Sequence, residues 1–438
     1  MKIYAYPSAA AEKRLQAIVN RGLGFRSKDI KMVQGIVETV RKQGDEALMQ
    51  YGRRFDAPDL TLEQLRVTQE EMTSAARQVD RKFKRALDLA AGQIESFHTR
   101  QRPNSWIDMP RPGTLLGQMV HPVDAAGVYV PGGKAGKTPL VSSVLMGAIP
   151  AKIAGVSNIV MATPPTRDGS VSPHLLVAAR RAGVNAVYKM GSAWAIAALA
   201  FGTRTIPKVD VIVGPGNIYV TLAKKLVAGS VQIDMIAGPS EILVLADETA
   251  EPAFVAADML SQAEHDPLAS AMLVTDSQDL AQKVSAALED QAGRLHRREI
   301  AEQSLKAFGA ILVVPDITVA IDLANRIAPE HLELIIKEPF ARLGEIRHAG
   351  AVFVGPYTPE PVGDYVAGPN HVLPTAGTAR FSSALSVDHF LKKTSLIHYS
   401  GEAFRKQAQA IIQLADIEGL GAHARSVSIR LDKTGKRP

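Results

Sequence analysis

Gly127-Val-Tyr-Val130, followed at once by Pro131-Gly-Gly133, is the first of several short apolar runs that end in a glycine or proline turn. Asn158-Ile-Val-Met-Ala162 and Ala186-Val-Tyr188 are the next runs, and alanine-rich stretches separate them. Short β-rich runs that alternate with helical stretches are typical of a parallel sheet with helices on both faces. This region therefore predicts an α/β fold.

The same alternation recurs further along the chain, from Glu241-Ile-Leu-Val-Leu-Ala246 to Ala351-Val-Phe-Val354. We therefore expect two α/β domains, preceded by helices over residues 27–101 and flanked by smaller terminal pieces. Thr61-Leu-Glu-Gln64 and Thr68-Gln-Glu-Glu71 both resemble helix capping boxes. Residues 355–385 are rich in Gly, Pro and Asn and are much longer than an ordinary connection of about 4–6 residues.

Composition excludes several classes of protein. The 438 residues are 46% hydrophobic and 21% charged, which is enough apolar material for a large core and argues against global disorder. The net charge of +6 is dispersed, whereas a nucleic-acid-binding protein usually concentrates its basic residues. The absence of cysteine excludes disulfides, iron–sulfur clusters and a thiol nucleophile. With no long apolar run and no signal-peptide pattern, we expect a cytoplasmic protein that binds neither membrane nor nucleic acid.

Pro131-Gly-Gly-Lys-Ala-Gly-Lys-Thr138 resembles a phosphate-binding P-loop, which would make the chain a phosphotransferase. A P-loop needs glycine where Pro131 stands, and proline has no N–H to offer a phosphate. A tight turn between strand and helix explains the segment equally well. Gly214-Pro-Gly216-Asn217 likewise begins like a dinucleotide fingerprint, but Tyr219 occupies the place of the third glycine.

Four groups of polar, metal-competent residues stand out: Gln262 with His265, Glu330 with His331, Asp364 with His371, and Glu418 with His423. The first pair has helical i, i+3 spacing, and the others lie in turns or Gly/Pro-rich segments. Loops that follow strands are where α/β sheets place their ligands. The residues alone thus indicate an α/β enzyme, with metal dependence as one option.

Nine motifs in order resemble the histidinol dehydrogenase family. They are Tyr129-Val-Pro-Gly-Gly133, Ser142-Ser-Val-Leu-Met146, Ala148-Ile-Pro-Ala-Lys152, Val213-Gly-Pro-Gly-Asn-Ile-Tyr-Val220, Ile236-Ala-Gly-Pro-Ser-Glu241, Ser261-Gln-Ala-Glu-His265, Ala328-Pro-Glu-His-Leu-Glu333, Val362-Gly-Asp-Tyr365 with Gly368-Pro-Asn-His-Val-Leu-Pro374, and Glu418-Gly-Leu420 with Ala422-His423. The resemblance spans nearly the whole chain.

The resemblance implies two incomplete Rossmann-like domains with small N- and C-terminal dimerisation segments. On this basis we expect an N-terminal helical arm at 1–24 and a C-terminal dimerisation segment at 386–438. The metal and substrate side would comprise 25–128 and 239–385, and the NAD side would comprise 129–238. The family is an intertwined homodimer, so each active site would be built from both chains.

The family oxidises L-histidinol to L-histidine through L-histidinal, the last step of histidine biosynthesis, with NAD and zinc. By resemblance the zinc ligands are Gln262, His265, Asp364 and His423. His331 matches the general base, and Glu330 matches the residue that activates water in the second oxidation. The residues matching substrate contacts are Ser240, Gln262, His265, His331, Asp364, His371, Glu418 and His423.

Two departures concern the cofactor side. Tyr129 and Asn217 match NAD contacts, but Trp194 stands where the family has a glutamine that contacts NAD. We expect Trp194 to contact the cofactor, with a buried core indole as the alternative. Gly136-Lys-Thr138 looks like an extension of the nearby loop, which would let Lys137 reach the pyrophosphate. A relative acting on another alcohol, such as a sulfonated diol, remains an alternative activity.

Overall fold

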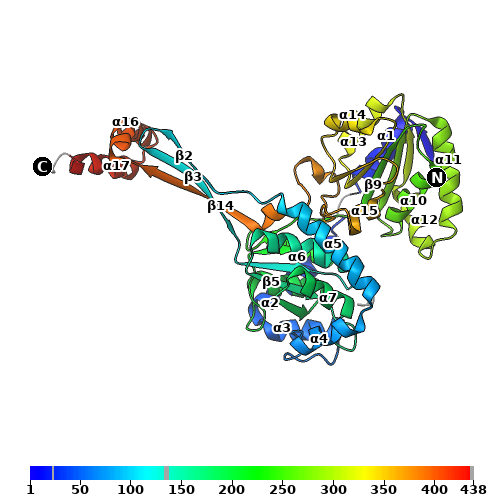
Figure 1. Cartoon of the computed structure of the whole chain (residues 1–438), viewed down its shortest axis with the longest axis horizontal. Helices are drawn as coiled ribbons and strands as arrows, with labels where there is room; N and C mark the ends of the chain where they lie inside the picture. Colours follow the sequence, from blue (N-terminus) through cyan, green and yellow to red (C-terminus); the bar gives the residue numbers. More distant parts are fainter. Residues whose placement is uncertain (22–23, 133–137, 435–438) are drawn as a thin grey trace. The chain divides into compact units, whose positions relative to one another are not determined.

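The computed structural model describes residues 1–21, 24–132 and 138–434 and divides the chain into two compact units (Figure 1). The first unit comprises Met1–Gln101 and Val123–Phe390, and the second comprises Arg102–Pro122 and Leu391–Pro438. Residues 133–137, which include most of the P-loop-like segment and Lys137, lie outside the described residues. Within the described residues, no helix is long and apolar enough to cross a membrane.

The first unit contains a six-stranded sheet in the order β1-β11-β10-β9-β12-β13, in which every pairing is parallel. From β11 to β13 the strands follow the 3-2-1-4-5 order of a Rossmann sheet without its sixth strand. The strands are β1 (Ile3–Ala5), β9 (Glu241–Ala246), β10 (Ser270–Thr275), β11 (Ala310–Val313), β12 (His331–Ile335) and β13 (Ala351–Val354).

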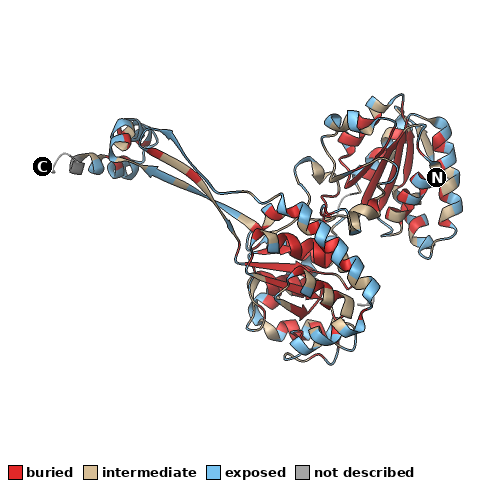
Figure 2. Ribbon diagram, viewed as in Figure 1, coloured by how far each residue is buried: buried red, intermediate tan, exposed pale blue. Residues whose placement is uncertain are grey.

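Both faces of this sheet are covered, so its central strands β9, β10 and β12 are buried at every position (Figure 2). In β9, Ile242 and Val244 pack with α10 and α11 on one face, whereas Leu243 and Leu245 pack with α1 and α13 on the other. This burial on two sides is why the strands read as continuous rather than alternating hydrophobic runs. The helices are α1 (Ala9–Val19), α10 (Pro252–Ala263), α11 (Gln278–Ala292), α12 (Arg298–Phe308), α13 (Ile317–Ile327), α14 (Pro339–Arg342) and α15 (Glu360–Tyr365).

A second parallel sheet in this unit has the order β6-β5-β4-β7-β8, again a 3-2-1-4-5 arrangement. Two incomplete Rossmann-like sheets are therefore present, and the predicted α/β fold class is confirmed. The strands are β4 (Ala125–Tyr129), β5 (Asn158–Thr163), β6 (Ala186–Lys189), β7 (Val211–Val213) and β8 (Gln232–Ile233).

The helices before residue 101 pack with this five-stranded sheet, so the assignment of 25–128 to the metal side is wrong. Val33 and Val40 of α2 share a core with Tyr188 and Trp194, and α4 and α5 pack against α7 and α6. An amphipathic helix shows that it has a partner but not which sheet it covers. The helices are α2 (Ser27–Gln43), α3 (Asp45–Tyr51), α4 (Gln69–Gln78), α5 (Arg81–Thr99), α6 (Val141–Ala154), α7 (Pro173–Ala182), α8 (Ser192–Phe201) and α9 (Ile218–Val227), with the π-helical turn η1 (Gly52–Asp56).

The predicted N-terminal arm at 1–24 is instead part of the six-stranded sheet. β1 pairs in parallel with β11, and Leu15 and Ile18 of α1 are buried in the core beneath that sheet.

One of the two capping boxes is also corrected. Thr68 and Glu71 form the predicted box. Thr61 begins a turn instead, in which its N–H donates to the side-chain oxygen of Gln64, which is one half of a capping box.

The second unit joins two distant parts of the chain. β14 (Leu391–Tyr399) pairs antiparallel with β3 (Thr114–Pro122), which in turn pairs with β2 (Trp106–Arg111). Helices α16 (Gly401–Ile417) and α17 (Gly421–Thr434) follow and pack against each other. The predicted segment 386–438 is therefore corrected: residues 386–390 belong to the first unit, and the remainder begins with a strand that needs residues 102–122 as its partner.

Candidate active site

The predicted catalytic residues lie at the amino ends of the central strands of the six-stranded sheet. His331 is the first residue of β12, Ser240 directly precedes β9, and the turn carrying His265 leads from α10 toward β10. The expectation that the site residues follow strands is therefore wrong for His331, Ser240 and His265, whereas Asp364 lies in α15, which follows β13. The spacing of apolar residues indicates a strand, but it does not show at which end of the strand the functional residues lie.

Glu330 and His331 are both buried and are held by the same neighbour, Glu241. The Glu241 N–H donates to Oε2 of Glu330 at 2.8 Å, and Nδ1 of His331 lies 2.9 Å from the Glu241 carbonyl oxygen. A carbonyl only accepts, so the His331 hydrogen is on Nδ1 and the lone pair is on Nε2. The geometry thus orients His331 as a base through Nε2.

Burial controls the proton affinities of this pair. Burial lowers the pKa of His331 to about 4, because a charged imidazolium is poorly solvated there. Burial also raises the pKa of Glu330 well above its usual range, and the nearby Glu241 carboxylate adds to the effect. A carboxylate with a raised pKa is a stronger base once it is ionised.

Further acids surround His331 on the side of α15. The Glu360 N–H donates to Oε1 of Glu333 at 2.9 Å, which joins α15 to β12. Ligand atoms of His331, Glu360 and Asp364 lie within 4.8 Å of one another, close enough to share a cation. Burial, together with Asp364, raises the pKa of Glu360 to about 9, as expected where like charges crowd a buried site.

Three of the four predicted zinc ligands belong to this region. The charges of Asp364, His265 and His371 all act on His331. Nε2 of Gln262 lies 3.4 Å from Nδ1 of His265, so the two side chains lie side by side, as their i, i+3 spacing predicts.

The oxygen of Gln262 gives a direct test of whether a metal ion fits. Gln262 is fully buried, yet its Oε1 has no hydrogen-bond partner among the described residues. An orphaned buried oxygen is costly, whereas a divalent cation would satisfy it and favour the ionised forms of the crowded carboxyls. The nitrogen and oxygen donors therefore fit a zinc ion.

His371 and Ser240 also lie near this group. Nδ1 of His371 is 3.2 Å from the carbonyl oxygen of Asp364 and 3.6 Å from its carboxylate. Ser240 accepts the Ser270 N–H through its carbonyl oxygen, which leaves its hydroxyl out of that strand pairing.

Glu418 and His423 belong to the second compact unit, apart from the other predicted ligands. Both line a cavity of about 390 Å³ formed by α16 and α17, together with Ile411, Leu414, Ala415, Ser426 and Val427. The structure thus brings these two predicted residues together and leaves them in a different unit from Gln262, His265 and Asp364.

The predicted NAD contacts lie at the carboxyl ends of the five-stranded sheet. Tyr129 ends β4, and its hydroxyl accepts the Ser192 N–H at 3.0 Å. Asn217 caps α9 by accepting the N–H groups of Tyr219 and Val220 through its side-chain oxygen. Gly214 has φ +115°, and a Cβ there would lie 2.1 Å from the Tyr129 carbonyl oxygen, so only glycine permits these two strand ends to approach.

Trp194 lies in the hydrophobic core rather than at an open strand end. The indole is 5% exposed and stacks against Tyr51 and Phe55, with ring centroids 5.8 and 5.4 Å away. Its Nε1–H donates to Asp56 at 3.1 Å, and burial raises the pKa of that carboxyl to about 6. These contacts favour the core alternative over the predicted cofactor contact.

Trp194→Ala should therefore destabilise the fold by about 3–5 kcal/mol, because it leaves a large cavity and removes a donor from buried Asp56. Thermal unfolding would show the loss, and the KM for NAD⁺ should change less than about twofold. Trp194→Phe is the control, since it keeps an aromatic ring while it loses the donor and part of the indole volume, and it should be less destabilised than Trp194→Ala. An unchanged melting temperature with a raised KM for NAD⁺ would instead support the cofactor contact.

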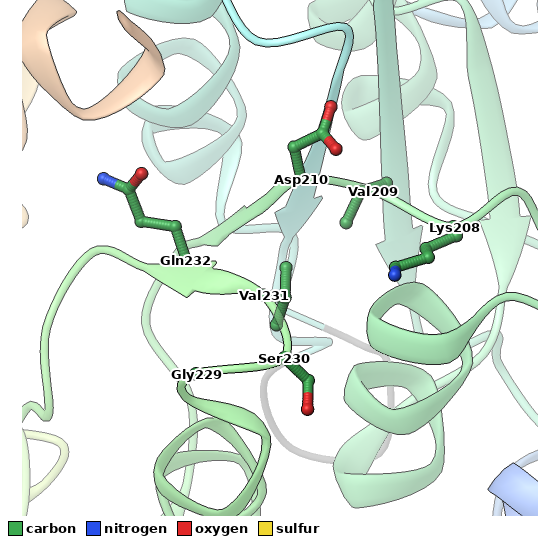
Figure 3. Close-up of a pocket in the computed structure, with 7 residues that line it drawn as sticks. All are labelled: Lys208, Val209, Asp210, Gly229, Ser230, Val231 and Gln232. Atoms are coloured by element: carbon green, nitrogen blue, oxygen red, sulfur yellow. The ribbon is translucent and has the colours of Figure 1, made fainter. Parts of the chain in front are cut away.

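A second cavity, also about 390 Å³, lies at the amino ends of β7 and β8. Figure 3 shows its lining, which is Lys208, Val209, Asp210, Gly229, Ser230, Val231 and Gln232. None of the predicted site residues is among them. This cavity lies at the amino ends of the strands, whereas Tyr129 and Gly214 lie at their carboxyl ends.

Sequence reasoning missed three acids of the site: Glu241, Glu333 and Glu360. The available signal was an acidic residue at the start of, or inside, a strand that is otherwise apolar on both faces. Glu241 heads Ile242–Ala246, and Glu333 interrupts His331–Ile335. A carboxyl in such a position is rarely buried without a partner or a function.

Comparison with known proteins identifies the relatives of this chain. The family model described as histidinol dehydrogenase matches residues 24–431. The histidinol dehydrogenase of Desulfotalea psychrophila is 55% identical, with 97% of this chain and 98% of that protein covered. The corresponding protein of Heliobacterium mobile is 52% identical, with 99% and 100% covered.

A solved structure agrees with these sequence relatives. The crystal structure of histidinol dehydrogenase from Elizabethkingia anophelis has a TM-score of 0.93 and 38% identity, with 100% of this chain and 99% of that chain covered. The family match and the identities extend across both units described above. The chain therefore belongs to the histidinol dehydrogenase family.

Proposed function

We propose that the chain catalyses the NAD⁺-dependent oxidation of L-histidinol to L-histidine through L-histidinal, the last step of histidine biosynthesis. The observation that carries this proposal is the buried Glu330–His331 pair with Gln262, His265 and Asp364 nearby, in a member of this oxidoreductase family. The alternative substrate, a sulfonated diol, is not favoured, because proteins 51–57% identical to the chain are named histidinol dehydrogenases.

His331 is the proposed base in both oxidation steps. Its Nδ1–H is held by the Glu241 carbonyl, so Nε2 is free to take the hydroxyl proton of the alcohol. Because the imidazole is buried, it remains neutral at physiological pH and is ready to accept a proton. NAD⁺, when bound, accepts the hydride that the substrate carbon loses in each step.

Glu330 is the proposed base for water in the second step. The aldehyde must add water before it can lose a second hydride, and this chain has no cysteine to form a thiohemiacetal instead. A Glu330 carboxylate can remove the proton of the attacking water. Its bond from the Glu241 N–H holds one carboxyl oxygen and leaves the other for this role.

Gln262, His265, Asp364 and His423 are the proposed zinc ligands, and zinc would hold the amine and imidazole of the substrate in place. Ser240, His371 and Glu418 are proposed to contact the substrate, Glu418 by pairing with its ammonium group. Tyr129 and Asn217 are the proposed NAD contacts. The nitrogen and oxygen donors and the unpartnered Gln262 oxygen support zinc at this position.

We also propose a cytoplasmic homodimer in which the second unit of one copy completes the site of the other. Exposed apolar side chains on that unit support docking, because a monomer rarely exposes so many together. They are Trp106, Ile107, Met109, Ile397, Leu414 and Ile417, between 52% and 76% exposed.

The direct test is the formation of NADH from L-histidinol in the absence of ATP. A histidinol dehydrogenase should release two NADH for each histidinol, because the reaction removes four electrons. No NADH from histidinol, or rapid turnover of a sulfonated diol, would contradict the proposed substrate. An ATP requirement would instead support the phosphotransferase alternative.

Mixing inactive His265→Ala with inactive His423→Ala should restore about a quarter of wild-type activity after the subunits reassort. In a mixed dimer, one site carries both defects and the other combines an intact body with an intact C-terminal unit. Random pairing makes about half of the dimers mixed, each with one working site of two. No recovery, despite reassortment confirmed with differently tagged subunits, would show that each site is built within one chain.

A further inference from the structure

A buried ion pair outside the proposed catalytic residues joins Arg21 to Glu241. Arg21 directly follows the α1 helix, and its Nη2 lies 2.7 Å from Oε1 of Glu241, with both side chains only 6% exposed. Burying two charges is expensive unless their geometry and hydrogen bonds compensate. The proposed reaction uses neither residue directly, so this pair of charges in the interior needs another explanation.

Glu241 contacts both proposed bases through hydrogen bonds. Its N–H donates to Oε2 of Glu330, and its Oε2 accepts the Glu330 N–H at 3.3 Å, so the two glutamates hold each other reciprocally. Its carbonyl oxygen accepts from His331, and its Oε1 accepts the Ala376 N–H at 3.0 Å. Any movement of the Glu241 side chain would therefore be transmitted first to Glu330.

The two proposed bases depend on different parts of Glu241. Glu330 is bound by the Glu241 carboxylate as well as by its backbone, whereas His331 is bound by the backbone carbonyl alone. The sheet also holds the backbone of Glu241, because Glu241 pairs in register with Ser270 of β10 and the next residue, Ile242, pairs with His331 of β12. Disturbing the carboxylate should thus affect Glu330 more than His331.

Arg21 is shaped for holding that carboxylate. Its guanidinium also donates to the carbonyl oxygens of Ile18, at 3.2 Å, and Pro239, at 3.4 Å. The planar guanidinium spreads five N–H donors over three nitrogens, so it can hold separated acceptors in a fixed geometry, whereas a lysine ammonium places its three donors on one nitrogen. Without Arg21, the Glu241 carboxylate would face the Glu330 carboxyl inside the protein with no ion-pair partner among the described residues.

We propose that Arg21 is a positioning residue for Glu330, acting through the Glu241 carboxylate, and that it supports the oxidation of the aldehyde more than that of the alcohol. This inference rests on the proposed function, because it assigns Glu330 to the aldehyde step. The alternative is that Arg21 only tethers the end of α1 to the sheet.

Arg14 provides a matched control for that alternative. It lies on α1, the helix that ends shortly before Arg21, and its guanidinium donates to the carbonyl oxygens of Lys306 and Gly309; among the described residues, no hydrogen bond joins it to the site. Arg14→Met and Arg21→Met each remove one arginine tether of α1. Only the second should change the partition between the two oxidation steps.

The experiment measures kcat for L-histidinol and for L-histidinal in the zinc-loaded enzyme, together with the melting temperature. Arg21→Met should slow histidinal oxidation by about 10–100-fold, the range found when a hydrogen-bonded supporting residue is lost, and histidinol oxidation by less than about fivefold. Arg21→Lys should recover part of the loss. Arg14→Met should leave both rates within about twofold of wild type, whatever its effect on the melting temperature.

A double variant decides whether Arg21 acts through Glu330. Arg21→Met combined with Glu330→Gln should be no slower in histidinal oxidation than Glu330→Gln alone, because the residue that Arg21 supports is already lost. Multiplied losses, or equal losses in both steps, would overturn the inference. If Arg21→Met does not fold, Arg21→Lys must still slow histidinal oxidation more than histidinol oxidation, by a smaller factor. An Arg21→Lys enzyme without this difference between the two steps would also overturn the inference. A wild-type enzyme that does not oxidise histidinal would refute the proposed function itself.

Discussion

Replacing His331 by asparagine should lower kcat for both histidinol and histidinal by about 10²–10⁴-fold, the usual contribution of a positioned general base. Asparagine can keep the hydrogen bond to the Glu241 carbonyl through its amide N–H, but it has no basic nitrogen where Nε2 stood. The loss therefore reports the base rather than a change in fold. Steady-state NADH formation with each substrate measures it, and the melting temperature should fall little.

Glu330→Gln is the informative comparison for this variant. Only the aldehyde step consumes water, so this change should slow histidinal oxidation far more than histidinol oxidation. Glutamine can still accept the Glu241 N–H, which keeps the local hydrogen bond. Equal losses in the two steps would contradict the role of Glu330, and a His331→Asn enzyme with nearly normal rates would contradict the role of His331.

Removing bound zinc with a chelator should lower turnover by about 10³-fold or more, because a positioning metal contributes several kcal/mol to the reaction. Without the ion, the Gln262 oxygen loses its expected partner and the carboxyls around Asp364 repel one another. Adding zinc should restore the rate. Full activity in protein shown to be metal-free would contradict the zinc proposal.

Zinc binding should also be visible without turnover. A ligand that binds only the folded state stabilises it by about 2.7 kcal/mol at a free concentration of 100 Kd, so zinc should raise the melting temperature. Gln262→Ala should weaken zinc binding in a competition titration. Gln291→Ala, on α11 and with its amide bonded to the Ala253 carbonyl, is the matched control and should leave zinc affinity unchanged.

Local sequence predicted the central elements of both sheets closely. Local signals mark the start of α7 and of α13, because Pro173 opens the first helix and the Asp316 side chain caps the second. Several peripheral strands, among them β1, β2 and β14, were not predicted. β1 has only three residues, and β2 is exposed along its whole length, so neither shows the burial that marks a strand.

The allocation of helices to domains could not be read from the sequence. The apolar stripe of α2 fits either sheet, and only packing shows that Val33 and Val40 lie with Trp194. The indole at 194 illustrates the same point. Its place after a strand suggested a ligand contact, whereas Tyr51, Phe55 and Asp56, more than 130 residues earlier, hold it in the core.

By itself, the sequence determined the α/β class, through apolar runs with the period and length of buried strands, and it supplied the catalytic candidates through motifs such as Pro329-Glu-His331. The tertiary structure alone decided that Glu330 and His331 stand at the amino ends of the strands, and that Glu241 joins them to Arg21, 220 residues away in the chain. The physical reason is that hydrophobic burial is non-directional. It indicates which segments are buried, but the hydrogen bonds and ion pairs that orient a site form only after folding has brought distant residues into contact.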